Sequence, residues 1–110
     1  MRLPGTVRNE IIDAMKNVDP ERVILFGSYA WGEPDENSDI DLYIVTKDDF
    51  IPSSWKEKRD IIRKVSRELL DLREKYAVDI IVHTKPMHEI FIETGSCFSK
   101  EITGSGYNLI

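Results

Sequence analysis

Residues 27–41 read GSYAWGEPDENSDID, which places a glycine–serine turn ahead of an Asp-x-Asp pair. The turn follows the apolar run Arg22–Phe26 (RVILF), which is typical of a short buried strand. Gly27 has no Cβ, so the chain can turn sharply there and bring its amide close to an anion. Ser28 then offers a hydroxyl and an amide at the start of a short helical turn, where free N–H groups favour negative charge. This stretch therefore predicts a cradle for a triphosphate.

The acidic pair begins a second predicted strand, Asp39–Thr46 (DIDLYIVT). Alternation along a strand puts Asp39 and Asp41 on one face and apolar side chains on the other. If both were ordinary turn residues, the spacing of two would have no explanation. Neighbouring carboxylates repel each other unless a cation lies between them, and an oxygen-rich site that shares its ligands with phosphates is typical of magnesium. The pair therefore predicts a Mg²⁺ site.

A third carboxylate, Asp79, lies alone in the apolar strand predicted for Tyr76–Thr84 (YAVDIIVHT). A buried carboxylate without a partner is unfavourable, so we expect Asp79 to lie beside the strand that carries Asp39 and Asp41. Three carboxylates in one place can hold two metal ions, one that activates an attacking oxygen and one that steadies a leaving pyrophosphate. Asp79 is the candidate general base for an incoming hydroxyl group.

Together these motifs resemble a known family, the nucleotidyltransferase superfamily that includes DNA polymerase β and the aminoglycoside nucleotidyltransferases. The small size and the ending of the chain resemble the minimal nucleotidyltransferases (MNT), the antitoxin half of prokaryotic HEPN/MNT pairs. The resemblance covers nearly the whole chain, although many members carry a basic residue where this chain has Trp31. The matching residues are Gly27-Ser28-x-Ala30-x-Gly32, Ser38-Asp39-x-Asp41-Leu42 and the lone Asp79.

The resemblance implies a substrate, a metal and a partner. ATP is the expected substrate, with Gly27 and Ser28 at its triphosphate and Mg²⁺, as two ions, on Asp39, Asp41 and Asp79. The expected reaction is attack of an acceptor hydroxyl on the α-phosphorus, which releases pyrophosphate. The expected partner is a HEPN toxin, a small helical ribonuclease that loses its activity when one of its tyrosines receives AMP. The chain would then be a protein adenylyltransferase within a toxin–antitoxin system.

Two other functions stay open. In the first, the protein neutralises its partner by contact alone and its site is vestigial, which the intact carboxylates disfavour. In the second, it modifies a small molecule as the aminoglycoside enzymes do, which the lack of an acceptor domain in 110 residues disfavours. We expect the acceptor to arrive on another protein, or a second subunit of a homo-oligomer to complete the pocket. The base preference, the modified residue and the number of AMP units stay open.

Composition supports one compact α/β domain spanning residues 1–110. A 41% apolar content in 110 residues suffices for one core and not for two. The net charge of −5, from 15 basic and 20 acidic side chains, argues against direct binding of nucleic acid. Cys97 is the single cysteine, and no charged-then-apolar leader opens the chain, so we expect a reducing cytoplasm. No apolar run approaches the length of a membrane span.

The hydrophobic pattern predicts a small mixed sheet flanked by helices. An apolar stripe predicts a helix over Val7–Val18, and the sequence Ser54-Trp55-Lys56-Glu57 is a capping box that opens a helix running to about Tyr76. The basic face of that second helix is interpreted as solvated rather than as a surface for a partner. One or two short helices follow Lys85, with a break at Gly95-Ser96. The second helix is expected to bury Trp55, Ile62, Val65, Leu69, Leu72 and Tyr76.

Four further residues have both a structural and a functional interpretation. His83 and His88 are read as ordinary side chains rather than metal ligands, because magnesium prefers oxygen. Of Tyr29 and Trp31, we expect one to pack inward and the other to be exposed beside the turn, where an aromatic ring can stack on a base or a partner. Two more residues are assigned local roles, with Cys97 as a packing or exposed thiol and Ser38 as a hydrogen-bonding partner within its own loop.

Overall fold

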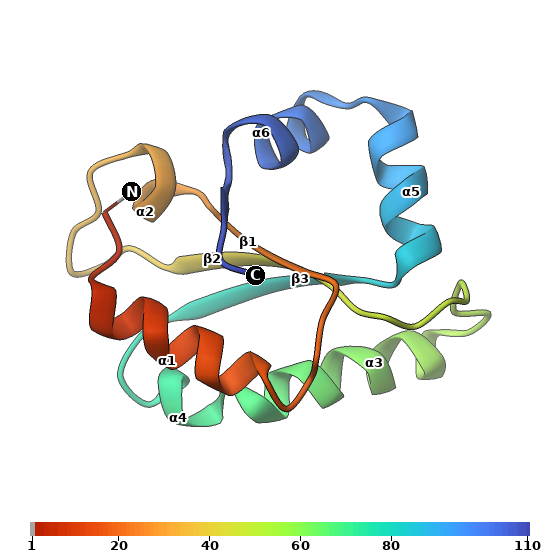
Figure 1. Ribbon diagram of the computed structural model, residues 1–110, viewed down its shortest axis with the longest axis horizontal. Coiled ribbons are helices and arrows are strands. Elements are labelled where there is room, and N and C mark those ends of the chain that lie inside the picture. The colour runs from red at the N-terminus through yellow and green to blue at the C-terminus, as the bar shows by residue number, and fades with distance from the viewer. Residues whose placement is uncertain (1) are drawn as a thin grey trace.

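Four strands form one sheet between two layers of helices in the computed structural model, which describes residues 2–110 (Figure 1). The strand order is β3-β2-β1-β4; β1 pairs antiparallel with β2 and β4, and β2 pairs parallel with β3. The predicted fold class, a small mixed sheet flanked by helices, is confirmed. The elements are α1 (Gly5–Met15), β1 (Arg22–Phe26), α2 (Ser28–Trp31), β2 (Ile40–Val45), α3 (Trp55–Glu68), α4 (Leu70–Arg73), β3 (Val78–His83), α5 (Lys85–Thr94), α6 (Cys97–Ser105) and β4 (Tyr107–Asn108).

Both faces of the sheet are covered, which explains why β2 is apolar along almost its whole length. Helices α1, α3 and α4 lie on one side of the sheet, and α5 and α6 lie on the other (Figure 1). Leu42 and Ile44 of β2 face the larger core, while Tyr43 and Val45 face the smaller one. Among residues 2–110, no helix has the length and apolar character that crossing a membrane requires.

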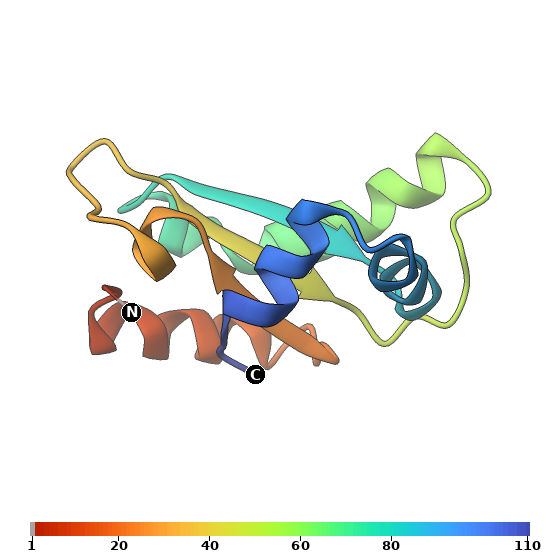
Figure 2. The same ribbon diagram turned by 90° about the horizontal axis from the view of Figure 1, so that it is seen from above.

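The helix that follows the capping box is shorter than predicted. Ser54 Oγ accepts a hydrogen bond from the amide of Glu57 at 3.2 Å, as expected of the cap. The helix ends at Glu68, and Leu69 separates it from the single turn of α4. The prediction that Trp55 is buried is wrong, since 68% of this residue is exposed. Figure 2 shows the reason: α3 begins beyond the end of the sheet, so its first turn does not lie over the core.

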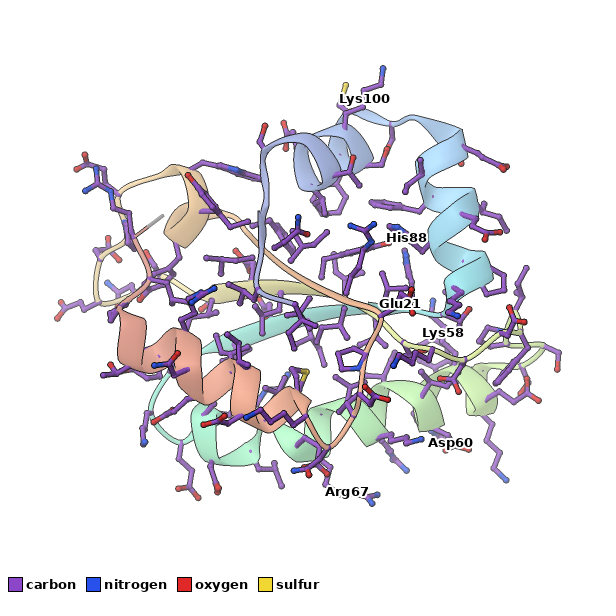
Figure 3. The ribbon with its side chains drawn as sticks, in the orientation of Figure 1. Glu21, Lys58, Asp60, Arg67, His88 and Lys100 are labelled. Atoms are coloured by element: carbon purple, nitrogen blue, oxygen red, sulfur yellow. The ribbon has the colours of Figure 1, made fainter. Side chains whose placement is uncertain are left out.

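The remaining predictions for this helix divide along its length. Val65, Leu69 and Leu72 are buried as expected, but Tyr76 is 37% exposed because it lies in the turn after α4. The basic face is exposed, as the solvated interpretation requires, and Figure 3 shows Arg67 on the outer side of α3. Only the half of this helix that lies over the sheet therefore contributes to the core.

The fourth strand, β4, was not predicted, because two residues are too few to show a strand pattern. Tyr107 and Asn108 pair with Leu25 and Ile24 of β1, and the amide of Leu109 donates to the carbonyl of Val23 at 2.7 Å. Gly106 makes this approach possible. A Cβ at Gly106 would overlap Ile102 O and Ile24 Cγ2.

Two glycines at the end of α6 give a test of this packing. Gly106→Ala should lower the free energy of unfolding by about 1–3 kcal/mol, because the added methyl overpacks the contact with β1. Gly104→Ala is the matched control, since a Cβ at Gly104, inside α6, meets nothing within 4 Å. It should stabilise the protein by about 0.5–1 kcal/mol. Urea unfolding measures both, and equal effects of the two changes would contradict the described packing of Gly106.

Candidate functional site

The three carboxylates singled out in the sequence meet at one end of the sheet. Asp41 of β2 lies opposite Asp79 of β3 in the parallel register and opposite Phe26 of β1 in the antiparallel one. Residues directly opposite on neighbouring strands point to the same face of a sheet. Asp39 immediately precedes β2 and lies two residues from Asp41, so its side chain points to that face as well. All three lie on the face that α5 and α6 cover further along the sheet.

The carboxylates affect one another electrostatically. A hydrogen bond with Asp79 raises the pKa of Asp39, and burial and the charge of Asp79 raise it further. Burial raises the pKa of Asp41, with the charges of Asp79 and Asp39 as smaller causes. In both residues the protonated form is favoured over the charged form, and the charge of a neighbouring carboxylate contributes to this. The site therefore favours a proton or a cation between the carboxylates.

Asp79 is exposed, so the argument that this residue needs a partner because it is buried is wrong. Asp39 and Asp41 are half-buried. Asp79 is the more exposed because β3 lies at an edge of the sheet, whereas β2 lies inside it. The proximity of Asp79 to the other two carboxylates comes from strand register instead of burial. Its exposure leaves it accessible to a reactant.

The fit of this site to a metal ion depends on how many protein ligands the ion needs. In residues 2–110, no group of three or more His, Cys, Asp or Glu side chains is arranged as a metal cage. Mg²⁺ usually binds one or two carboxylates and takes its other ligands from water and substrate phosphates. The raised pKa values of Asp39 and Asp41 indicate a negative potential that a cation would relieve. The residues present therefore fit a magnesium ion that is shared with a substrate.

Gly27 brings the turn into contact with the carboxylates. Its φ of 77° and ψ of −155° lie in a region that is essentially restricted to glycine. A Cβ at this position would overlap Oδ2 of Asp41 and lie 3.0 Å from its Cγ. In the described part of the chain, the amides of Ala30 and Trp31 both donate to Gly27 O at 3.0 Å. The earlier amides, of Ser28 and Tyr29, precede the first bonded turn of α2 and donate to no group among residues 2–110, which leaves them available to an anion.

The structure also agrees with the packing expected for Tyr29 and Trp31 and with the local roles expected for Ser38 and Cys97. Tyr29 packs against the larger core, whereas Trp31 is 42% exposed and donates a hydrogen bond from Nε1 to Ser105 O at 2.6 Å. Ser38 Oγ accepts a hydrogen bond from the amide of Asp35 at 2.9 Å and so holds its own loop. Cys97 is exposed.

His83 and His88 have the structural role that was expected of them. Their Nδ1 atoms lie 3.0 and 2.7 Å from the hydroxyl of Tyr43, in a part-buried group between α5 and the sheet, and Figure 3 shows His88 on this inner side of α5. Burial is the main cause of the lowered pKa of both histidines, so the neutral form is favoured. Burial also raises the pKa of Tyr43. Sequence analysis missed Tyr43, whose only signal was a hydroxyl group within an apolar strand.

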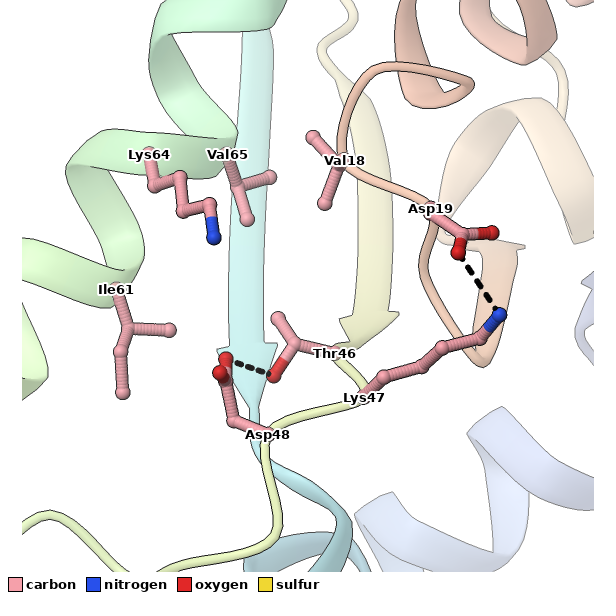
Figure 4. Close-up of a pocket in the computed structure, with 8 residues that line it drawn as sticks. All are labelled: Val18, Asp19, Thr46, Lys47, Asp48, Ile61, Lys64 and Val65. Atoms are coloured by element: carbon pink, nitrogen blue, oxygen red, sulfur yellow. Dashed lines mark hydrogen bonds and ion pairs between the residues drawn. The ribbon is translucent and has the colours of Figure 1, made fainter.

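A small cavity of about 210 Å³ lies away from the carboxylates, between α3 and the end of β2 (Figure 4). Thr46, which directly follows β2, donates a hydrogen bond to Asp48 at 2.8 Å, and Lys47 pairs with Asp19 at 3.0 Å. Most of the polar side chains that line this cavity are thus already paired with each other. Because it lies at the opposite end of β2 from Asp41, it plays no part in the candidate site.

Comparison with known proteins agrees with this geometry. Residues 9–102 match the family described as "Polymerase beta, Nucleotidyltransferase". The chain belongs to this family. A relative of this nucleotidyltransferase from Methanocaldococcus jannaschii, named "Putative protein adenylyltransferase MJ0141", is 38% identical over 82 residues, which are 74% of this chain and 78% of the relative. The matched range includes the glycine turn and the three carboxylates Asp39, Asp41 and Asp79, which we call the acid row.

Two solved structures share the fold of this nucleotidyltransferase. One is described as "Crystal structure of the toxin-antitoxin with AMP-PNP", with a TM-score of 0.54 and 22% identity. The other, "Crystal structure the toxin-antitoxin MntA-HpeT mutant-D39ED41E", has a TM-score of 0.52 and 21% identity. Each alignment covers 94% of this chain and 72% of the other. At this identity the likeness establishes the fold.

Gly27→Ala tests the contact between the turn and Asp41. The substitution places a Cβ on the Asp41 carboxylate and an L-residue in a glycine-only region, which costs about 1–3 kcal/mol. We expect binding of Mg²⁺–ATP, measured by calorimetry, to weaken by at least about tenfold. Gly5→Ala is the matched control, because a Cβ at Gly5 meets nothing within 4 Å. A folded Gly27→Ala protein with parental affinity would contradict the assignment of the turn.

Asp79→Asn tests the electrostatic coupling. The folded state raises the pKa of Asp39 and Asp41 above the ordinary 3.8, so it binds protons more tightly than the unfolded chain and loses stability as the pH rises through these values. Removing the Asp79 charge should therefore raise the unfolding temperature by several degrees at neutral pH. The gain should disappear at acid pH, where the carboxyls are protonated.

Two comparisons complete this test. Asp49→Asn makes the same charge change at an exposed loop position and should not reproduce the gain. Mg²⁺ should raise the unfolding temperature of the parent protein more than that of Asp79→Asn, because it relieves the same repulsion. Equal unfolding temperatures of the parent and Asp79→Asn at neutral pH would show that the carboxylates are not coupled.

Proposed function

We propose that this nucleotidyltransferase transfers AMP from ATP to a hydroxyl group, that of a tyrosine, on a partner HEPN ribonuclease toxin, and so acts as its antitoxin. The observation that carries the proposal is the contact between the Gly27 turn and Asp41, with Asp79 beside Asp41 in the next strand. In this arrangement the turn that we take as the triphosphate cradle lies against Asp41. The name of the M. jannaschii relative, and the toxin–antitoxin complexes that share the fold, support the choice of a protein acceptor.

In this proposal each residue has a separate task. The turn at Gly27 and Ser28 holds the triphosphate through the amides of Ser28 and Tyr29, and Asp39 and Asp41 would hold the metal that shares it. Mg²⁺, as two ions when bound, supplies positive charge that activates the acceptor oxygen and stabilises the leaving pyrophosphate. Asp79 is a further ligand and the general base, because it is exposed and accessible to the acceptor. The acceptor oxygen forms a bond to the α-phosphorus, the bond to the pyrophosphate breaks, and the acceptor proton passes to Asp79.

Exposed apolar side chains favour a macromolecular acceptor over a small molecule. Ile51 and Trp55 line one pocket and are more than half exposed, at 54% and 68%. Neighbouring exposed apolar residues are typical of protein–protein contact. In this proposal residues 1–110 act as one domain in the cytoplasm, and the acceptor is presented by the partner, with neither a membrane nor direct binding of nucleic acid involved.

Intact mass spectrometry tests the proposal. Incubation of the protein with ATP, Mg²⁺ and its cognate HEPN partner should raise the mass of the partner by one or more adenylyl units and abolish its ribonuclease activity. Asp79→Asn should keep most of the affinity for ATP and lose transfer by at least about 100-fold, the usual contribution of a general base. A partner that stays unmodified but is inhibited equally well by the Asp39→Asn/Asp41→Asn variant would establish neutralisation by contact instead.

A further inference from the structure

Trp31 connects the glycine turn to the C-terminal helix. Its indole Nε1–H donates a hydrogen bond of 2.6 Å to the carbonyl of Ser105, the last residue of α6. The last carbonyls of a helix lack partners within the helix, so the indole satisfies one of them. The two residues are 74 positions apart in the sequence. The bond therefore joins the turn to the far end of the chain, and Figure 1 shows α2 and α6 on the same side of the sheet.

Two phenylalanines strengthen the connection. The ring of Phe26 lies 6.5 Å from that of Trp31 and 5.7 Å from that of Phe98 in α6, the second pair in an edge-to-face arrangement. Both spacings are in the range of favourable aromatic pairs. Phe26 is also the residue opposite Asp41 in the pairing of β1 with β2. The aromatic contacts thus lie directly beside the acid row.

Helix α2 needs such tertiary contacts, because it has only four residues and no side-chain cap at Gly27. A single helical turn is unstable by itself. Ala30 is buried, and the carbonyl of Tyr29 accepts a hydrogen bond from the amide of Arg2 at 2.8 Å, which fix the helix from the side of the larger core. Trp31 fixes it from the side of α6.

The carbonyl of Ser105 is a rigid point of attachment. The next residue, Gly106, packs so closely against Ile102 and Ile24 that no Cβ fits there, and β4 then pairs with β1. The end of α6 is therefore held to the same sheet that carries Asp41. A hydrogen bond to this carbonyl locates α2 relative to the acid row.

We propose that Trp31 is a positioning residue for nucleotide binding, which acts through Ser105 to hold the amides of Ser28 and Tyr29 in place for the triphosphate. Residues 97–110 are then part of the nucleotide site, although they contribute no carboxylate to it. The indole is uncharged, so it acts on the geometry of the turn and not on its electrostatics. The inference rests on the proposed function, in which the triphosphate binds at this turn.

The test compares the same substitution at the two tryptophans of the chain. Trp31→Phe keeps an aromatic ring and removes the N–H donor, and Trp55→Phe is the control at the exposed start of α3. The Kd of Mg²⁺–ATP should rise about five- to tenfold in Trp31→Phe, as expected for one lost hydrogen bond, and not in Trp55→Phe. Without nucleotide, amide hydrogen exchange should quicken at residues 28–31 and 105–110 only in Trp31→Phe.

Fluorescence adds a signature that loss of stability alone would not produce. Mg²⁺–ATP should change the emission of Trp31 in the Trp55→Phe protein and leave that of Trp55 unchanged in the Trp31→Phe protein. A parental Kd in Trp31→Phe, or unchanged exchange at residues 28–31, would overturn the inference. Failure of the parent protein to bind Mg²⁺–ATP would instead overturn the proposed function, and the exchange comparison, which uses no nucleotide, would still decide whether Trp31 holds α2 to α6.

Discussion

The parallel pairing of β2 with β3 is the constraint on which the site depends. In this register Asp41 lies opposite Asp79, and the buried pair Ile44 and Val82 follows further along the same strands. A shift by one residue would turn every side chain of β3 to the other face and separate the two carboxylates. The apolar side chains of the larger core hold the register because they cannot face solvent. Packing of the apolar core thus determines the positions of the carboxylates, although none of them belongs to the core.

One face of the sheet carries two different polar groups, one at the end where β2 and β3 begin and one further along. At the end where β2 and β3 begin, Asp39 and Asp41 lie beside Asp79, and the pKa of both carboxyls is raised, mainly by the hydrogen bond with Asp79 for Asp39 and by burial for Asp41. Further along the same face, the hydroxyl of Tyr43 is bonded to two histidines beneath α5. That group is satisfied internally, whereas the carboxylates are left for something from outside. This contrast separates a polar group that stabilises the fold from one that is available for chemistry.

Contact between Gly27 and Asp41 explains why the turn and the acidic pair belong to one motif. The glycine leaves room for the carboxylate, so the same residue permits the sharp turn and the close approach of Asp41. A phosphate on the turn and a cation on Asp41 would then be neighbours, as shared coordination of magnesium requires. The C-terminal segment closes this region from the other side, since Trp31 and Phe26 both contact α6 or its end.

The sequence by itself indicated most of the elements, the turn and the acidic residues, because alternation in β2 and the glycine before α2 are local features. Burial was harder to predict. Trp55 and Asp79 were both expected to be buried and are exposed, because α3 extends beyond the sheet and β3 is its edge strand. Strand order and register decide these points, and both depend on contacts between residues that are distant in the sequence. The pairing of β4 and the bond from Trp31 to Ser105 are of the same kind, and only the tertiary structure could decide them.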